Sequence, residues 1–190
     1  MTAVQDNLIS RRSIYRFQDK AVPRECLELA FEAARHAPCH KQTHPWCFYV
    51  LGNGSREKII EVVEAMAREK AARSDGEDTE KMVKKARSKI FDPPVLIAVT
   101  SERTVADPFR DQEDYAATVC AVHNLVLSLW DQGIGCQWST GSITRDPVVY
   151  QMLNVSAEQQ QVIGFLKAGY PAVIPGREKK AIDKIRFYLD

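Results

Sequence analysis

Residues 114–131, with the sequence DYAATVCAVHNLVLSLWD, are the stretch that decides the fold. Apolar side chains recur there at alternating spacings of four and three: Tyr115, Val119, Val122, Val126 and Leu129. The opposite side carries residues small enough for another backbone to approach closely: Ala117, Cys120, Ala121, Asn124 and Ser128. This periodicity predicts a helix, and a helix that is apolar or small over most of its surface is buried over most of it. In a chain of 190 residues, we therefore expect this helix to run through the centre of a dimer.

Shorter periodic segments on either side predict a mixed order of helices and strands. Helices are expected at 23–37, from residue 55 onward, and after Asp146-Pro147. Strands are expected at 46–51, 95–100, 135–140 and 161–168, with a last short strand at 186–189. Because this order is neither a βαβ series nor all helical, it favours an α+β fold.

Residues 68–92 stand apart from this pattern. They are highly charged and are interrupted by Ser74-Asp75-Gly76, with few apolar positions. We interpret them as a peripheral helical excursion whose lysines form a solvated face. No repeat or linker divides the chain, so residues 1–190 are expected to form a single domain.

Composition and charge are those of an ordinary globular protein. Hydrophobic residues make up 45% and charged residues 27% of the chain, and the formal net charge of +1 predicts neither a nucleic-acid nor a membrane partner. No apolar run reaches the roughly 18–20 residues of a membrane span, and no secretory signal is recognised. The five cysteines are scattered without a Cys-x-x-Cys pair. A reduced, cytoplasmic protein is therefore expected.

Arg11-Arg12-Ser13 places two guanidinium groups beside a hydroxyl. The planar fork of arginine matches phosphate oxygens bidentately, and the hydroxyl adds a donor. The alternative is a solvated basic turn. Arg177, which is followed by Lys179 and Lys180, has the same two interpretations: a further phosphate contact or a solvated end.

Residues 36–44 hold three of the four histidines and one cysteine. The cluster suggests a metal site, but the prolines at both ends oppose a helix that would pair His40 with His44, and no second cluster completes a tetrahedral shell. The favoured alternative is a cofactor loop whose donors meet the edge of a heterocycle or a ribityl chain. A nucleophilic Cys39 assisted by His40 is a third possibility.

Gln137-Trp138-Ser139-Thr140-Gly141 ends a predicted strand in an aromatic ring, two hydroxyls and a glycine. This is either an ordinary strand end or a ring and hydroxyls that contact a flavin. Gly52-x-Gly54 is followed by Glu57, where a dinucleotide fingerprint needs glycine or alanine, and no Walker-type loop is present. A flavin enzyme needs neither motif, because its cofactor carries the chemistry.

Together these segments resemble the FMN-dependent nitroreductase family, most closely its small members with an Ala-Pro-Asp-His-Lys loop. The shared motifs follow the family's order along nearly the whole chain: Arg11-Arg12-Ser13, Phe17, Pro23, Ala37-Pro38-x-His40-Lys41, Pro45-Trp46, Phe48, Glu113, Gly133-x-Gly135, Trp138, Gly141, Gly164-Phe165-Leu166 and Gly169-x-Pro171. The resemblance implies an α+β sandwich with a mixed, mostly antiparallel sheet flanked by helices. It also implies an intertwined homodimer with two FMN sites at its interface.

The resemblance further implies which residues surround FMN. Arg11, Arg12 and Ser13 would lie on its phosphate and ribityl side. The loop would contribute His36, Cys39 and His40, and the strand end would contribute Trp138, Ser139 and Thr140. Members of the family take a hydride from NADH or NADPH and reduce nitroaromatics, quinones or other flat acceptors in a ping-pong cycle. No side chain is assigned a catalytic step of its own.

Two other functions remain open. A flavoprotein of the same fold could reduce an enone, remove a halogen reductively or fragment the flavin, with residues 68–92 covering its substrate. A non-catalytic flavin or metal carrier would bind its ligand without turnover by any nicotinamide.

Overall fold

A computed structural model describes residues 2–74 and 78–190 of the chain. Its strands are β1 (Trp46–Val50), β2 (Val95–Glu102), β3 (Gly135–Ser139) and β4 (Gln160–Gly169). They form one sheet in the order β1-β2-β4-β3, and all three strand pairings are antiparallel. The parallel part of the predicted mixed sheet is a single bridge between Ser13 and Cys136 at the β3 edge.

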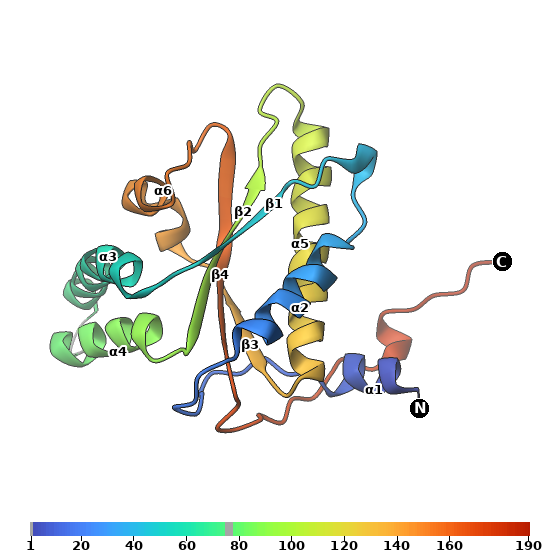
Figure 1. Ribbon diagram of the computed structural model, residues 1–190, viewed down its shortest axis with the longest axis horizontal. Coiled ribbons are helices and arrows are strands. Elements are labelled where there is room, and N and C mark those ends of the chain that lie inside the picture. The colour runs from blue at the N-terminus through green and yellow to red at the C-terminus, as the bar shows by residue number, and fades with distance from the viewer. Residues whose placement is uncertain (1, 75–77) are drawn as a thin grey trace.

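Helices cover both faces of the sheet (Figure 1). They are α1 (Ala3–Ser10), α2 (Arg24–Arg35), α3 (Asn53–Ala72), α4 (Thr79–Phe91), α5 (Pro108–Asp131) and α6 (Pro147–Leu153). Short 3₁₀ turns occur at His40–Gln42, Ser142–Arg145 and Ile182–Lys184. Helices α2 and α5 lie on one face, and α3, α4 and α6 lie on the other. This arrangement confirms the predicted α+β sandwich.

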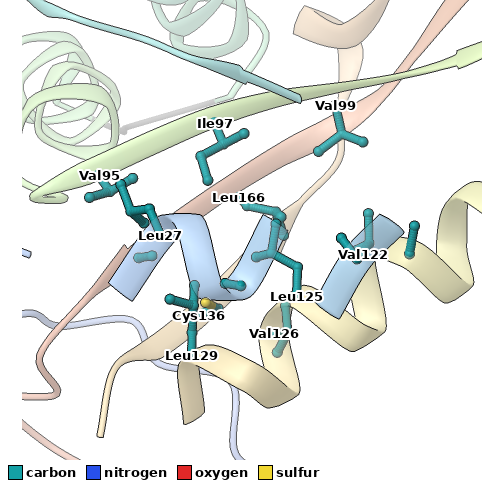
Figure 2. Packing of buried hydrophobic residues seen from close by; sticks show 14 of the residues in the cluster. Leu27, Val95, Ile97, Val99, Val122, Leu125, Val126, Leu129, Cys136 and Leu166 are labelled. Atoms are coloured by element: carbon teal, nitrogen blue, oxygen red, sulfur yellow. The ribbon is translucent and has the colours of Figure 1, made fainter. Parts of the chain in front are cut away.

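The alternation of side chains along β2 explains why both faces are covered. Val95, Ile97 and Val99 belong to the core beneath α2 and α5, which Figure 2 shows from close by. Leu96 and Ala98 point the other way, into a second core with α3 and α6. Because successive strand residues face opposite sides, a continuously apolar strand is stable only between two covering layers.

Helix α5 begins six residues earlier than predicted. Asp107 caps it by accepting a hydrogen bond from the Arg110 backbone, and Pro108 occupies the first turn, where its missing N–H costs nothing. The helix is deeply buried on one side: Ala117, Thr118, Ala121, Val122, Leu125, Val126 and Leu129. Tyr115, in contrast, is 40% exposed, so part of the predicted apolar face does not reach the core of its own chain.

Two further predictions concern the periphery. The excursion is helical, formed by the end of α3 and by α4, and the break predicted at Ser74-Asp75-Gly76 lies mostly outside the described residues. The strand predicted at 186–189 is wrong: these residues are irregular and exposed, and the tail leads away from the sheet (Figure 1). A strand needs a partner strand for its backbone hydrogen bonds, and the tail lies beside none in its own chain. None of the described helices combines the length and apolarity needed to cross a bilayer.

Candidate functional site

The segment after α1 runs along the open edge of β3. The Ile14 backbone N–H donates to the Cys136 carbonyl at 2.9 Å, and the Ile14 side chain is completely buried. Gly135 permits this approach, because a Cβ there would lie 2.2 Å from Ile14 Cγ1. The buried isoleucine therefore fixes the segment and leaves the flanking Arg11 and Ser13 at the edge of the sheet.

A basic cavity of about 250 Å³ lies beside this segment. Residues from both ends of the chain line it: Arg11, Arg12, Ser13, Tyr15, Arg177, Glu178 and Lys179. The predicted phosphate ligands, including Arg177, are thus brought together although some 160 positions of sequence separate them. Four cationic side chains against one carboxylate make this cavity suitable for a phosphate group.

The two adjacent arginines have different surroundings. Nη1 of Arg12 donates to the carbonyls of Ile9, Ser10 and Arg11 at 2.7, 3.0 and 2.8 Å, so this side chain also closes the C-terminal end of α1. Arg11 makes no side-chain hydrogen bond or ion pair with any described residue. Arg11 is therefore the better-placed cation for an external anion.

A second cavity of about 230 Å³ adjoins the first through Arg11 and Ser13. Its walls come from α5 and β3: Val119, Val122, His123, Val126, Cys136 and Trp138. Burial raises the pKa of the Cys136 thiol to about 12, against a lowering by the nearby Arg11 charge, so this thiol stays protonated and unreactive. An apolar wall beside an arginine and a serine suits a flat, partly polar ring.

The end of β3 divides the remaining predicted residues between the two faces of the sheet. Trp138 lies on the α5 side, where Gly164 makes room for its indole: a Cβ at Gly164 would lie 2.1 Å from Nε1. Ser139 pairs with Phe165 and lines a third cavity, on the α3–α4 side. Thr140 follows the strand and is exposed. Trp138 and Ser139 therefore meet different spaces, as strand alternation requires.

The histidine-containing loop has contacts other than those predicted. His36 Nε2 lies 3.1 Å from Glu32, and the pKa of that carboxyl is lowered by its hydrogen bonds to Arg35 and His36. Cys39 Sγ lies 3.9 Å from His44 Nδ1, and no described hydrogen bond joins it to His40. In residues 2–74 and 78–190, no three metal-ligating side chains gather at one point.

A buried carboxylate fixes this loop to the start of α5. Asp114 is 3% exposed; it accepts from Thr43 Oγ1 at 2.8 Å and from Arg110 Nε at 3.0 Å. Arg110 also donates to the His40 carbonyl at 3.2 Å. Lys41, Gln42 and His44 have positive φ angles, so the loop needs such anchoring. Sequence reasoning missed this role; the only signal was an acidic residue beginning an otherwise apolar helix.

Replacing Asp114 by asparagine tests the anchor. The amide can still accept from Thr43 but cannot form the ion pair with Arg110, so we expect a loss of about 1–2 kcal/mol in the free energy of unfolding. Hydrogen exchange should rise at residues 40–44 and stay unchanged in β4. Equal protection of the loop in both proteins would show that Asp114 does not hold it.

Within one chain, the loop and the arginines lie at different parts of α5. The loop contacts Arg110 and Asp114 near the start of α5, whereas Asn7 donates to the Leu127 carbonyl and Ser10 accepts from Trp130 near its end. A helix rises about 1.5 Å per residue, and the two sets of contacts are more than three turns apart. Arg11, Arg12, Ser13 and Arg177 therefore line one cavity, and Arg11 and Ser13 share the second with Trp138. His36, Cys39 and His40 line neither.

Comparisons with known proteins agree with this architecture. The sequence model of the nitroreductase family matches residues 8–170. An Escherichia coli K12 protein with the provisional name NAD(P)H nitroreductase YdjA is 36% identical over 166 residues, which are 86% of each chain. A solved nitroreductase-like protein from Bacillus cereus superimposes with a TM-score of 0.83 at 26% identity, covering 100% of this chain and 97% of the other. The chain belongs to the nitroreductase family.

A more distant solved structure shares the fold. It is oxidised iodotyrosine deiodinase bound to FMN and 3-iodo-L-tyrosine, with a TM-score of 0.75 and 22% identity. The alignment covers 98% of this chain and 100% of that one. At this identity the likeness concerns the fold alone.

Proposed function

We propose that this protein is an FMN-dependent oxidoreductase that takes a hydride from NADH or NADPH and reduces flat organic acceptors such as nitroaromatics or quinones. The observation that carries the proposal is the pair of joined cavities at the β3 edge. One gathers Arg11, Arg12 and Arg177, and the other has apolar walls and ends at Trp138. A molecule that carries a phosphate at one end and a flat ring at the other matches a cationic cavity next to an apolar one.

The residues at this edge have distinct roles in the proposal. Arg11 and Arg177 bind the phosphate, and the Ser13 hydroxyl lies where a ribityl chain would connect phosphate and ring. Val119, Val122 and Trp138 exclude water from one side of the ring. FMN, when bound, would accept the hydride from the nicotinamide and pass the electrons to the acceptor. No side chain here is asked to act as a nucleophile or general acid.

The apolar cavity proposed to hold the flavin ring is too small to do so within one chain, which indicates that a second copy of the chain completes it. At about 230 Å³ it is small for a three-ring system, since ligand pockets usually enclose roughly 300–1,000 Å³. Tyr115, about one helical turn before Val119 on α5, is 40% exposed, so the helix leaves an apolar side chain uncovered near the cavity. We propose a homodimer in which the loop at 36–44 of one protomer completes the flavin site of its partner. This arrangement would bring His36, Cys39 and His40 to the cofactor.

We propose that the protein acts in the reducing cytoplasm, where its five cysteines would stay free thiols. We also propose that residues 1–190 form one flavin-binding domain. The carrier alternative shares the binding site but not the nicotinamide reaction.

The visible spectrum tests the proposal. The purified protein, supplemented with FMN, should show a bound flavin band that bleaches on anaerobic addition of NADH or NADPH and returns with a quinone. Sedimentation should give twice the chain mass. A protein that takes up no FMN would sink the proposal, and bound flavin that no nicotinamide reduces would leave only the carrier function.

A further inference from the structure

A further cavity lies between the α3–α4 pair and the sheet. Its volume is about 670 Å³. Its apolar walls come from both helices, from β4 and from the turn after β3: Val63, Met66, Ala67, Met82, Ala86, Ile90, Ile143 and Phe165. A space of this size accommodates an organic molecule with a hydrophobic body.

A buried lysine lies at the sheet side of this cavity. Lys167, on β4, is 6% exposed and stands between Leu96 of β2 and Gln137 of β3. Its ammonium group has no hydrogen bond or ion pair with any described residue, yet the side chain lines the cavity. Lysine is rarely buried to this degree, because leaving water is costly for a charge. The ammonium nitrogen itself is not fully enclosed and opens into the cavity, where it is available to an anionic group that enters.

The surrounding charges have the same sign. Lys70, Arg73, Lys85 and Lys89 also line the cavity, whereas Glu69 is the single carboxylate among the described lining residues and lies 3.8 Å from Arg73. Glu64, the next acidic side chain on α3, is engaged by Arg68 and Arg87 at 3.2 Å each. The cavity thus combines an apolar lining with unbalanced positive charge.

We propose that this cavity binds an organic anion that has an aromatic or aliphatic body and one carboxylate, with the carboxylate paired to Lys167 and Lys89. Burial, together with a smaller contribution from the Lys89 charge, lowers the pKa of Lys167 to about 8. An entering carboxylate would oppose both effects, because opposite charge favours the protonated amine.

The position of the cavity suggests the role of this anion. Ser139, next to Trp138 at the end of β3, lines the cavity on the opposite face of the sheet from the proposed flavin site, and Gly141 continues the lining beyond the strand end. An acceptor held by its carboxylate would therefore reach the flavin around the end of β3. This role rests on the proposed function, whereas the binding itself does not.

Equilibrium binding of two matched probes tests the inference. We would titrate FMN-loaded protein, without nicotinamide, with 4-nitrobenzoate and with the neutral 4-nitrobenzyl alcohol. The carboxylate should bind at least about tenfold more tightly, because a charge-assisted hydrogen bond contributes that much. Lys167→Met should remove the preference, and Lys89→Met should reduce it by a smaller factor. Lys84→Met removes the same charge from an exposed position of α4 outside the cavity and should leave the preference intact.

Three results would overturn the inference: equal affinity for the two probes, an equal loss in Lys84→Met, or displacement of 4-nitrobenzoate when FMN is added to flavin-free protein. The last would assign the cavity to the flavin. Lys89 lies on a surface helix, so its variant decides the question even if Lys167→Met does not fold. If the protein takes up no FMN, the proposed function fails, and the same titration of the purified protein still tests the binding.

Discussion

Replacing Arg56 by methionine should lower the free energy of unfolding by about 3–5 kcal/mol. Arg56 is 6% exposed and lies in the first turn of α3. Its guanidinium group donates to five backbone carbonyls, those of Leu51, Ile90, Phe91, Pro93 and Pro94, at 2.8–3.4 Å. These carbonyls join the end of β1, the end of α4 and the turn into β2, so one side chain connects three elements.

The physical reason for the large effect is the loss of many partners at once. Methionine fills a similar volume but leaves buried acceptors unpaired, and each such group costs about 1–3 kcal/mol. The last carbonyls of α4 also carry the negative end of the helix dipole, which a cation stabilises. Burial lowers the pKa of Arg56. The side chain nevertheless stays charged, because arginine titrates far above neutral pH.

A matched control separates this effect from the loss of a charge on α3. Arg68 lies on the same helix, is 58% exposed and pairs with Glu64 on the surface. Arg68→Met should cost less than about 1 kcal/mol, as exposed ion pairs do. Chemical denaturation of both variants, followed by circular dichroism, gives the comparison. Equal losses in the two variants would mean that the five carbonyls do not depend on Arg56.

Arg56 also illustrates what sequence patterns cannot predict. The apolar run at 95–100 predicts a buried strand, because a strand covered on both faces must be apolar throughout. Arg56 and Asp114 are polar residues on helices and Lys167 is one on a strand, where a polar residue ordinarily faces water. Their partners are backbone carbonyls, a distant threonine and a cavity, and only the packing of separate elements brings these together.

The candidate site was predictable to the extent that its motifs are local. Arg11-Arg12-Ser13 is predicted from the sequence as a phosphate-binding segment, and Arg177 lines the same cavity in the folded chain. The sequence could not distinguish the two arginines, because the engagement of Arg12 by the end of α1 depends on where that helix stops. The loop at 36–44 is predicted to belong to the same site, although within one chain it contacts the start of α5 and the arginine segment contacts the end. The strand expected at 186–189 is wrong because a short β pattern does not say whether a partner strand lies beside it.

The Arg11→Ala variant should bind FMN about 10–100-fold more weakly while keeping its stability. Arg11 lines both cavities at the β3 edge and makes no side-chain hydrogen bond or ion pair within the described ranges. Its removal therefore breaks no contact of the protein itself. A charge-assisted pair with phosphate contributes roughly 1.5–3 kcal/mol, which gives this factor in affinity. Fluorescence quenching of FMN on titration with flavin-free protein measures the loss.

Two further variants make the result specific. Arg16→Ala removes the same charge four to five positions away, from an exposed side chain outside both cavities, and should leave FMN affinity within about twofold, since exposed charges act weakly through water. Arg12→Ala should weaken FMN and also destabilise the protein, because Arg12 closes α1. If Arg11→Ala retained full affinity while Arg12→Ala lost it without a change in stability, the phosphate would belong to Arg12. The hydrogen bonds from Arg12 to the end of α1 would then have to break when the cofactor binds. The FMN affinity and the free energy of unfolding of Arg12→Ala, measured together, therefore decide between the two arginines.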